Sequence, residues 1–335
     1  MAAAAAVAVD VGAEKPGRKD RIMINKNLVT ALLLGTALVF GAVAVPAPAH
    51  AMSDDLQTYV GPEPTLFDTP EAAIATFKDV MAKGDLPAIS ALLGLDAAKV
   101  EKAEDITDTL KQIQEATSEG VSIEEEEDQR VLDLGKQLWP FPFPVVKGED
   151  GKWAFDTVAG LEEIVNRRIG ENELHAIDTM RLYVQAQEDY SGEDHDGDGV
   201  LEFAQKLIST EGLTDGLYWP AEQGDGESPV GPGLDTAMLE KAKAGDGYFG
   251  YKFRILKRQG DNVAGGAHDY VVNGNMINGF ALIAWPAKYG ETGVSTFVVN
   301  QAGVVYERDF GADTGNIVPK ILSFNPSDKW ELVED

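Results

Sequence analysis

A 34-residue stretch, residues 157–190, constrains the fold of this chain more than any other segment. Its sequence, TVAGLEEIVNRRIGENELHAIDTMRLYVQAQEDY, has the composition and spacing of a long helix. In its second half, one face collects these residues at helical spacing: Leu174, Ile177, Met180, Arg181, Tyr183 and Val184. That side is mostly apolar and the other is charged, which predicts a helix lying on a hydrophobic core. Gly170 and Asn172 predict a break within it.

The C-terminal third predicts an antiparallel sheet for this helix to cover. In YFGYKFRIL, residues 248–256, aromatic and aliphatic residues alternate with Lys252 and Arg254, which is the period of a half-buried strand. Asn273-Gly274 is a strong signal for a tight hairpin, and the stretch NQAG predicts another turn further along. We therefore expect four or five antiparallel strands packed on the long helix. A short helix is predicted between them and the long helix, over residues 200–210.

Two helices are predicted near the start of the folded part, within residues 67–94. Thr69 is a good N-cap with Pro70 at the first helical position. Gly84 ends this first helix, and Asp85 caps the second. Apolar residues recur on one face of each helix, so both helices should pack on a core.

A hairpin is predicted over residues 138–157, LWPFPFPVVKGEDGKWAFDT, because aromatic and aliphatic residues alternate on both sides of GEDG. Its prolines place the first strand at a sheet edge or a bulge. The charge run VSIEEEEDQR, residues 121–130, is interpreted as a solvated face or loop. Two helices packed on such a hairpin resemble the cone-shaped α+β domains related to nuclear transport factor and polyketide cyclases. That resemblance implies an enclosed pocket.

Residues 1–51 have the features of an export signal. Five Lys and Arg residues precede an apolar run, residues 28–45, and the segment ends in Ala49-His50-Ala51, the small-x-small pattern that signal peptidase cleaves. We expect cleavage after Ala51 and a periplasmic or secreted protein. Met23 is a plausible true start, which would leave residues 1–22 upstream of it. The alternative is an uncleaved anchor, since about 18 apolar residues are near the lower limit for spanning a bilayer.

Composition excludes several classes of function. The chain has no cysteine, which rules out disulfides, thiolate metal sites, a cysteine nucleophile and a cysteine-linked lipid anchor. Its formal net charge is −28, and near −30 once residues 1–51 are removed. Such a charge repels nucleic acid and anionic lipid headgroups. We expect no nucleic-acid partner and no membrane insertion after signal cleavage.

The motif DHDGDGVLE, residues 194–202, has the residue order of a calcium-binding loop. Aspartates stand at positions one, three and five, glycine at six, a backbone carbonyl donor at seven and glutamate at nine. Oxygen ligands on a tight glycine turn suit the hard cation Ca²⁺. The predicted metal ligands are Asp194, Asp196, Asp198, Val200 and Glu202.

Position twelve of this loop departs from the calcium pattern. Gln205 stands where a bidentate glutamate is expected, so the site is weak or incomplete unless Glu193, Glu202 or a distant carboxylate closes it. Gly192 breaks the helix before position one, which favours a solitary loop over a paired EF-hand. An acidic, solvated turn without a metal is the alternative interpretation.

Catalytic motifs are weakly represented, and no catalytic residue is predicted. Ser228 lacks the glycine pattern of a nucleophile elbow, and His268 and Asp269 are sequence neighbours that need not face one way. His175 has no second histidine at zinc-ligand spacing. Acidic and basic residues near the start of the long helix predict ion pairs at helical spacing: Glu162, Glu163, Arg167 and Arg168.

Four aromatic residues leave two interpretations open. They are Tyr218, Trp219, Trp285 and Tyr289. Together they would make a sugar-stacking surface, and separately they would be buried anchors for a loop and a sheet. The second interpretation is favoured, because aromatic side chains bury large apolar areas.

Several motifs in a fixed order resemble a known family. The segments are NRRIGENELHAIDTMRLYVQAQEDY, DHDGDGVLEFAQKLIST, DGLYWP, ESPVGP, GYKFRIL, DYVVNGNMINGFALIAWPAKYG and GVSTFVVNQAGVVYERD. They look like the bacterial exported family called domain of unknown function 2950, from about Pro70 to the C-terminus. The resemblance implies no particular activity. More distantly, the helix, loop and sheet are similar to type IV pilin and pseudopilin heads. Glu171, Glu173 and Asp178 on the helix argue against polymerisation.

These observations predict an α+β protein in three parts. Residues 1–51 are the signal peptide, residues 52–160 a helix-plus-hairpin domain, and residues 161–335 a pilin-head-like domain with the calcium-type loop. The expected function is a non-catalytic binding or scaffold module with a structural calcium ion, acting on an unknown envelope protein or ligand. The alternative is an envelope hydrolase that cleaves glycan or peptide through carboxylates. Two carboxylates about 5–9 Å apart beside an exposed Trp219 would favour the hydrolase, and an apolar groove would favour binding.

Overall fold

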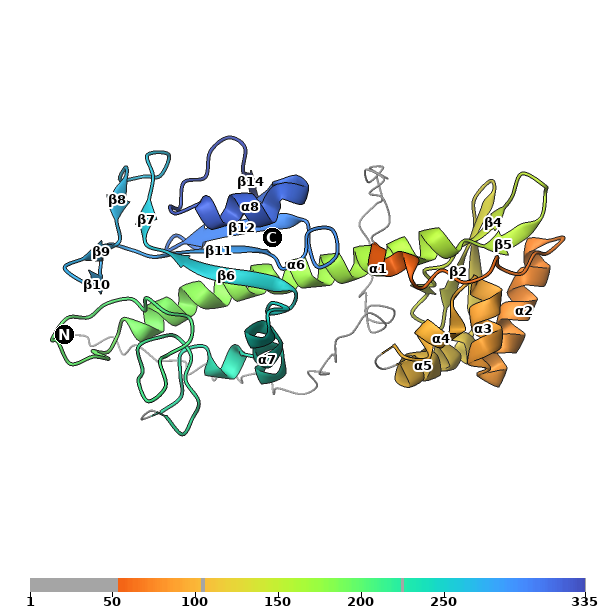
Figure 1. Ribbon diagram of the computed structural model, residues 1–335, viewed down its shortest axis with the longest axis horizontal. Coiled ribbons are helices and arrows are strands. Elements are labelled where there is room, and N and C mark those ends of the chain that lie inside the picture. The colour runs from red at the N-terminus through yellow and green to blue at the C-terminus, as the bar shows by residue number, and fades with distance from the viewer. Residues whose placement is uncertain (1–53, 104–105, 224–225, 335) are drawn as a thin grey trace, which may run out of the picture.

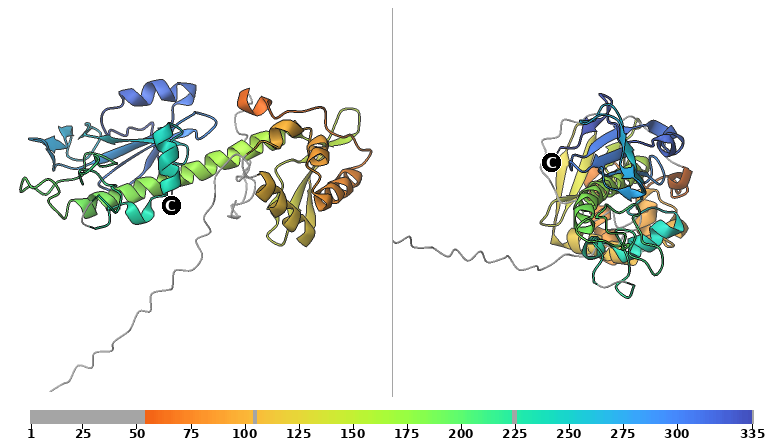
Figure 2. Two further views of the ribbon diagram at one scale, coloured as in Figure 1. Left: turned by 60° about the horizontal axis from the view of Figure 1, so that its bottom comes forward. Right: turned by 90° about the vertical axis from the view of Figure 1, so that its left-hand side faces the viewer.

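One long helix, α6 (Thr157–Tyr190), runs through two separate hydrophobic cores (Figures 1 and 2). The computed structural model describes residues 54–103, 106–223 and 226–334, so the predicted signal lies outside the described residues. The N-terminal core takes side chains of α6 as far as Ile169, and the C-terminal core begins with Ala176. The protein is therefore α+β. Its two units share α6, and the boundary between their cores lies within this helix, between Ile169 and Ala176.

The helix α6 is continuous, so the predicted break at Gly170 and Asn172 is wrong. Asp156 caps its start by accepting a hydrogen bond from the Ala159 backbone N–H at 3.0 Å. A glycine inside a helix costs only about 1 kcal/mol relative to alanine. Near that glycine, Arg168 and Asn172 donate hydrogen bonds to two backbone carbonyls of the C-terminal unit, at 3.0 and 2.9 Å. These contacts hold the segment in place against its weak local preference.

The first turns of α6 are fixed by a predicted ion pair. Arg167 contacts Glu163 at 2.7 Å, which confirms the expected pairing one helical turn apart. Arg167 also donates to the Pro140 carbonyl at 2.9 Å and lies over the ring of Trp139. The guanidinium group thus ties the helix to the N-terminal sheet.

The N-terminal unit packs helices on an antiparallel sheet of order β1-β2-β4-β5, with β3 paired to β2. Its helices are α1 (Asp54–Gln57), α2 (Pro70–Lys83), α3 (Leu86–Leu93), α4 (Ala97–Val100) and α5 (Ile106–Glu119). Its strands are β1 (Val121–Glu125), β2 (Gln129–Leu134), β3 (Trp139–Pro140), β4 (Val145–Lys147) and β5 (Trp153–Phe155). Thr69 and Asp85 cap α2 and α3, and Gly84 ends α2 in the left-handed conformation, so the two predicted helices are confirmed.

The charge run at residues 121–130 is a strand pair rather than a loop. Val121 to Glu125 form β1, which pairs in register with β2. The glutamate side chains are exposed, so the expected solvated face is present. The strand itself was missed because its pairing partner supplies the apolar side, through the buried Leu132 and Leu134. The hairpin expected around GEDG is confirmed for β4 and β5. Its first strand begins only at Val145, and β4 also pairs with β2, so the expected edge position is wrong.

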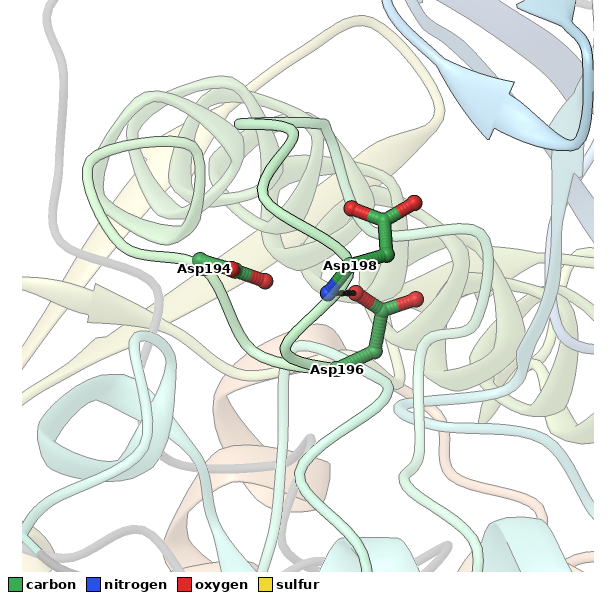
Figure 3. Close-up of side chains that lie close together, drawn as sticks. All are labelled: Asp194, Asp196 and Asp198. Atoms are coloured by element: carbon green, nitrogen blue, oxygen red, sulfur yellow. Dashed lines mark hydrogen bonds between the residues drawn. The ribbon is translucent and has the colours of Figure 1, made fainter.

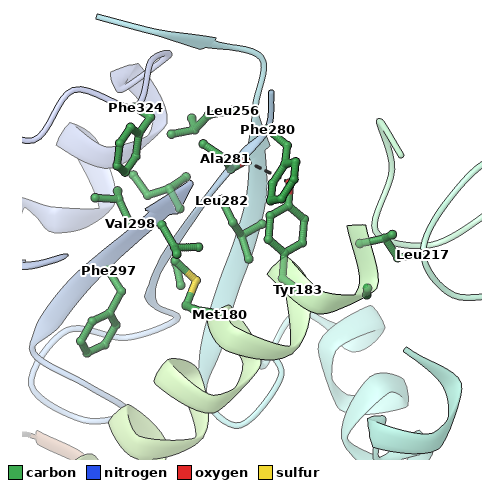
Figure 4. Close-up of a cluster of buried hydrophobic side chains, with 14 of the residues drawn as sticks. Met180, Tyr183, Leu217, Leu256, Phe280, Ala281, Leu282, Phe297, Val298 and Phe324 are labelled. Carbon is green, nitrogen blue, oxygen red and sulfur yellow. Dashed lines mark hydrogen bonds between the residues drawn. The ribbon is translucent and has the colours of Figure 1, made fainter. Parts of the chain in front are cut away.

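The C-terminal unit contains a five-stranded antiparallel sheet of order β14-β13-β12-β11-β6, which confirms the expected sheet. The strands are β6 (Tyr251–Leu256), β11 (Ala281–Pro286), β12 (Ser295–Asn300), β13 (Tyr306–Asp309) and β14 (Glu331–Leu332). The second half of α6 packs on β11 and β12. Figure 4 shows Met180 and Tyr183 projecting from α6 toward Leu282 and Phe280, and Phe297 belongs to the same cluster. Burial of this apolar cluster is the main force that holds helix and sheet together.

Short elements surround this sheet. They are α7 (Thr236–Ala244), β7 (Arg258–Gln259), β8 (His268–Asp269), β9 (Val271–Val272), β10 (Asn275–Met276), α8 (Thr314–Ile317) and three 3₁₀ turns, Gly231–Gly233, Gly311–Asp313 and Val318–Lys320. The predicted hairpin at Asn273-Gly274 is confirmed, since β9 and β10 pair across it and both residues have positive φ angles, 53° and 102°. The helix α7, capped by Asp235, was not foreseen.

The helix predicted over residues 200–210 is wrong, and this segment is irregular. Its backbone groups bond outward instead of along a helix. Phe203 N–H donates to the Met276 carbonyl at 2.9 Å, and Ala204 exchanges two hydrogen bonds with the buried Gln187 side chain. These tertiary bonds satisfy the backbone and remove the need for helical ones.

Glu173 links α6 to the sheet. Its Oε1 accepts hydrogen bonds from the backbone N–H groups of Val294 and Ser295, both at 2.8 Å, and from the Tyr251 hydroxyl at 3.3 Å. Burial is the main reason that the pKa of Tyr251 is raised, and the nearby Glu173 carboxylate raises it further. The carboxylate thus serves as an internal acceptor at the start of β12.

In the described part of the chain, no helix has the length and hydropathy needed to cross a membrane.

Candidate functional site

The aspartate loop lies between the end of α6 and the β9–β10 hairpin. Asp194, Asp196 and Asp198 are exposed, and each offers a carboxylate oxygen within 4.8 Å of those of the other two. Figure 3 shows the Asp194 carboxylate pointing across the loop toward the other two aspartates. The structure therefore brings together the three aspartates that the sequence singled out. Three acidic groups this close repel one another unless cations or hydrogen-bond donors offset their charge.

Backbone donors within the loop offset part of that charge. Asp194 accepts hydrogen bonds from the N–H groups of Gly197 and Gly199, at 2.8 and 3.0 Å. The Gly199 bond is the largest cause that lowers the pKa of Asp194, followed by the Gly197 bond. Both glycines have positive φ angles, 76° and 84°, a conformation that side chains resist. This turn folds the loop around the first aspartate.

The other two aspartates also bond to loop backbone. Asp196 accepts from the Asp198 N–H at 3.2 Å, and Asp198 accepts from the Val200 N–H at 2.7 Å. The second oxygen of Asp198 accepts from the Asn275 side chain of β10 at 2.7 Å. An ionised carboxylate offers about four lone-pair sites, so each aspartate keeps acceptor capacity for a cation.

Glu202, predicted as a fifth ligand, is used elsewhere in this structure. Its Oε2 accepts the Met276 N–H at 2.8 Å, and it lies outside the three-aspartate cluster. Gln205, at position twelve, donates to the Gly274 carbonyl at 2.6 Å and accepts from Lys257 at 2.9 Å. Val200, the predicted carbonyl ligand, follows Asp198 in the same turn. The second half of the loop therefore fastens the β9–β10 hairpin to the end of α6.

His195, inside the loop, was not singled out from the sequence. Its ring stacks on Tyr190 with centroids 3.9 Å apart and lies 5.8 Å from the Trp219 ring. Its Nε2 donates to the Tyr190 carbonyl at 3.1 Å. Burial raises the pKa of Tyr190 to about 12, and its hydroxyl donates to the Thr214 carbonyl at 3.2 Å. This aromatic stack anchors the loop to the core, and the sequence signal for it is the aromatic pair on either side of the motif.

An apolar cavity of about 470 Å³ lies between α6, α7, the edge strand β6 and the loop before α7. Its walls include Leu182 and Tyr183 of α6, Leu239 and Ala242 of α7, and Phe253 of β6. A smaller apolar cavity, about 90 Å³, lies in the N-terminal unit where the cone-shaped resemblance implied a pocket. Only the larger one has the volume of sites that bind small molecules, about 300–1,000 Å³.

A comparison with protein families places the chain. The family model described as Protein of unknown function (DUF2950) matches residues 64–333. The chain belongs to this family. No curated protein and no solved structure matches it.

The residues weighed for catalysis do not converge in this DUF2950 protein. Ser228 is buried and its hydroxyl has no hydrogen-bond partner. His268 directs both ring nitrogens to backbone carbonyls, and Asp269 pairs with Arg258. His175 stacks on Phe249 at 4.2 Å. No nucleophile–base pair is formed by these described residues.

The four aromatic residues of this DUF2950 protein do not form one surface. Tyr218 and Trp285 are half-buried and line the large apolar cavity. Trp219 is buried, only 5% exposed, and Tyr289 donates to Asp309 at 3.2 Å. The exposed tryptophan that would have favoured a glycan hydrolase is therefore not present at position 219.

Proposed function

We propose that this protein is a non-catalytic module of the cell envelope that binds a small apolar molecule. The large cavity in the C-terminal unit carries the proposal. Its walls are mainly aliphatic and aromatic, and Tyr218 and Tyr248 are among the aromatic residues that line it. An apolar cavity of about 470 Å³ with a few polar groups has the character of a ligand site rather than of a packing defect. The location in the envelope rests on the export features of residues 1–51.

An apolar fluorescent probe tests the cavity. N-phenyl-1-naphthylamine should bind the wild-type protein with an increase in emission. Ala242→Trp, on the wall formed by α7, should fill the space and weaken binding at least about tenfold, since it removes the volume that the probe needs. Fluorescence titration gives the dissociation constants.

Ala237→Trp is the matched control, because Ala237 is exposed on the same helix and does not line the cavity. It should leave probe binding unchanged. Equal affinities of wild type and Ala242→Trp would mean that the probe binds elsewhere, and the proposal would be abandoned.

We also propose that Asp194, Asp196 and Asp198 hold a structural calcium ion. Three carboxylates clustered on a glycine turn support this assignment, since oxygen ligands suit a hard divalent cation. Glu202 and Gln205 are committed to the β9–β10 hairpin in this structure, so the ion would take water or a backbone carbonyl, such as that of Val200, at its remaining positions. A dissociation constant of about 10⁻³ M is the range of such extracellular sites.

Thermal unfolding tests the calcium site. At 10 mM calcium, ten times the expected dissociation constant, mass action should stabilise the protein by about 1.4 kcal/mol. For a chain of this size that raises Tm by about 3 °C. Magnesium should give a smaller increase, because it prefers a tighter octahedral shell. Differential scanning calorimetry with and without chelator measures both effects.

The variant Asp196→Asn distinguishes stabilisation by calcium from the stability of the metal-free fold. The Asp196 carboxylate accepts a hydrogen bond from the Asp198 N–H, and asparagine retains that acceptor. The variant should unfold like wild type in chelator and lose the calcium increment. Asp328→Asn, an exposed change at the far end of the chain, should keep the increment. Identical melting curves of wild type in calcium and in chelator would identify the motif as an acidic turn.

The C-terminal unit is similar to pilin heads only in having a long helix packed on an antiparallel sheet. Of the three carboxylates that argued against polymerisation, Glu173 is directed to the sheet and binds its backbone. Asp178 is exposed on the helix. Both features support a monomeric domain rather than a filament subunit.

A further inference from the structure

We propose that the large cavity takes a single-chain amphiphile with an anionic headgroup, such as a carboxylate or a phosphate. This inference rests on the proposed function and adds the chemistry of the ligand. It follows from the distribution of charge around the cavity rather than from its volume.

The walls would receive the apolar chain. Leu182 of α6 and Leu239 of α7 both line the cavity, and Leu217 and Leu282 belong to the core that Figure 4 shows beside Tyr183. Apolar area removed from water contributes about 25 cal/mol per Å², so an aliphatic chain gains most of its affinity from such walls. A polar ligand would lose its hydrogen bonds to water on entering the cavity, and the apolar walls offer no hydrogen bonds to replace them.

The charge of the lining is opposite to that of the chain. The protein has 56 Asp and Glu against 28 Lys and Arg, yet no described residue that lines this cavity is acidic, and two are lysines. Lys243 lies in the last turn of α7, and Lys252 is exposed on the edge strand β6. An acid-rich chain that leaves acidic groups out of one cavity makes that cavity selective against cations and open to an anion.

Both lysines are available to a headgroup. The side chain of Lys252 forms no hydrogen bond or ion pair with any described residue. It alternates with Phe253 on β6, so it starts from the opposite face of this edge strand, and its ammonium would reach the cavity around the strand edge. Lys243 contacts Glu240 at 2.8 Å, but both side chains are about half exposed or more, and such surface pairs contribute little. The lysines in the last turn of α7 also outweigh the partial charge of about −0.5 at that helix end.

The polar groups favour one small headgroup over a polyanion. Lys243 and Lys252 are the charged groups among the described lining residues, and the walls provided by α6 and β11 are largely apolar. A ligand with several charges would meet those walls and the overall charge of −28. An amphiphile places one charge at the lysines and the rest of its length among apolar side chains.

Displacement of N-phenyl-1-naphthylamine from the full-length mature protein tests the headgroup. The competitors are dodecanoate, dodecyl phosphate, dodecan-1-ol and dodecyltrimethylammonium, all below their micellar concentrations. The two anions should bind at least about tenfold more tightly than the cation, which corresponds to two exposed charge contacts. Comparison of dodecanoate with dodecyl phosphate then distinguishes a free fatty acid from a phosphate headgroup.

The double variant Lys243→Met/Lys252→Met removes both charges and keeps the apolar stems. It should reduce the preference for the anions to less than about threefold while binding of dodecan-1-ol is unchanged. Lys320→Met, an exposed lysine outside the cavity, should retain the full preference.

The outcomes separate the two proposals. If Ala242→Trp abolishes probe binding but the four competitors bind equally well, the anionic ligand is overturned and the apolar site is kept. A preference for anions that survives the double methionine variant also overturns it. Absence of probe binding to the wild type overturns the proposed function itself, and the ligand inference with it.

Discussion

Replacement of Gly160 by alanine is expected to destabilise the protein by about 1–2 kcal/mol. Gly160 lies in the first turn of α6, and a Cβ atom there would be 2.0 Å from Cδ1 and 2.4 Å from Cγ of Phe143. That ring is 2% exposed and packed in the aromatic core of the N-terminal unit, so it has little room to move. Overpacking of this kind costs about 1–3 kcal/mol, which exceeds the roughly 1 kcal/mol by which alanine favours a helix.

Gly170→Ala is the matched control on the same helix. A Cβ at Gly170 meets no atom within 4 Å, so the helical preference of alanine acts alone. This variant should be stabilised by about 0.5–1 kcal/mol. Urea unfolding followed by circular dichroism measures both variants. A destabilised Gly170→Ala, or a neutral Gly160→Ala, would contradict the continuous helix and its close contact with the sheet.

The second large effect is expected from Glu173→Ala, which should destabilise the C-terminal unit by about 2–3 kcal/mol. The substitution leaves the backbone N–H groups of Val294 and Ser295 without their acceptor. Hydrogen bonds to a charged acceptor contribute about 1.5–3 kcal/mol each, and water that enters the site recovers part of the loss. The Tyr251 hydroxyl keeps the Ser295 carbonyl as its partner, at 2.9 Å.

Asp178→Ala controls for the loss of a carboxylate from α6. Asp178 is 75% exposed and its ion pair with Arg181 is 4.0 Å long, so the change should stay within about 0.5 kcal/mol. Denaturant unfolding, read by tryptophan fluorescence, compares the two. Equal effects of the two substitutions would mean that Glu173 acts through helix charge and not through the β12 backbone.

Local signals in the sequence predicted the elements whose causes are local. The caps Thr69 and Asp85, the Asn273-Gly274 turn and the alternation in residues 248–256 all act within a few residues, and each is present in the fold. The failures have distant causes. Residues 200–210 bond to β10 and to Gln187, and the helix near Gly170 is held by the loop before β12.

The same contrast between local and distant causes explains why the aspartate loop could be predicted from the sequence and the cavity could not. Asp194, Asp196 and Asp198 could be predicted because their spacing along the chain fixes their spacing in space. Glu202 could not, because its role depends on the position of Met276 in another hairpin. The cavity brings together residues from Thr179 to Trp285, and α7, one of its walls, gave no strong signal. Its charge pattern is visible only after folding.

The shared helix α6 makes the two units one mechanical body. At about 1.5 Å per residue its 34 residues span about 51 Å, and Leu161, Ile164 and Val165 belong to the core of one unit while Met180 and Tyr183 belong to the other. Removing either unit would expose the apolar side of the helix that it covers. Fragments cut at residue 160 would thus lose part of the N-terminal core. Unfolding of one unit would also unwind the end of α6 next to the other unit and destabilise it.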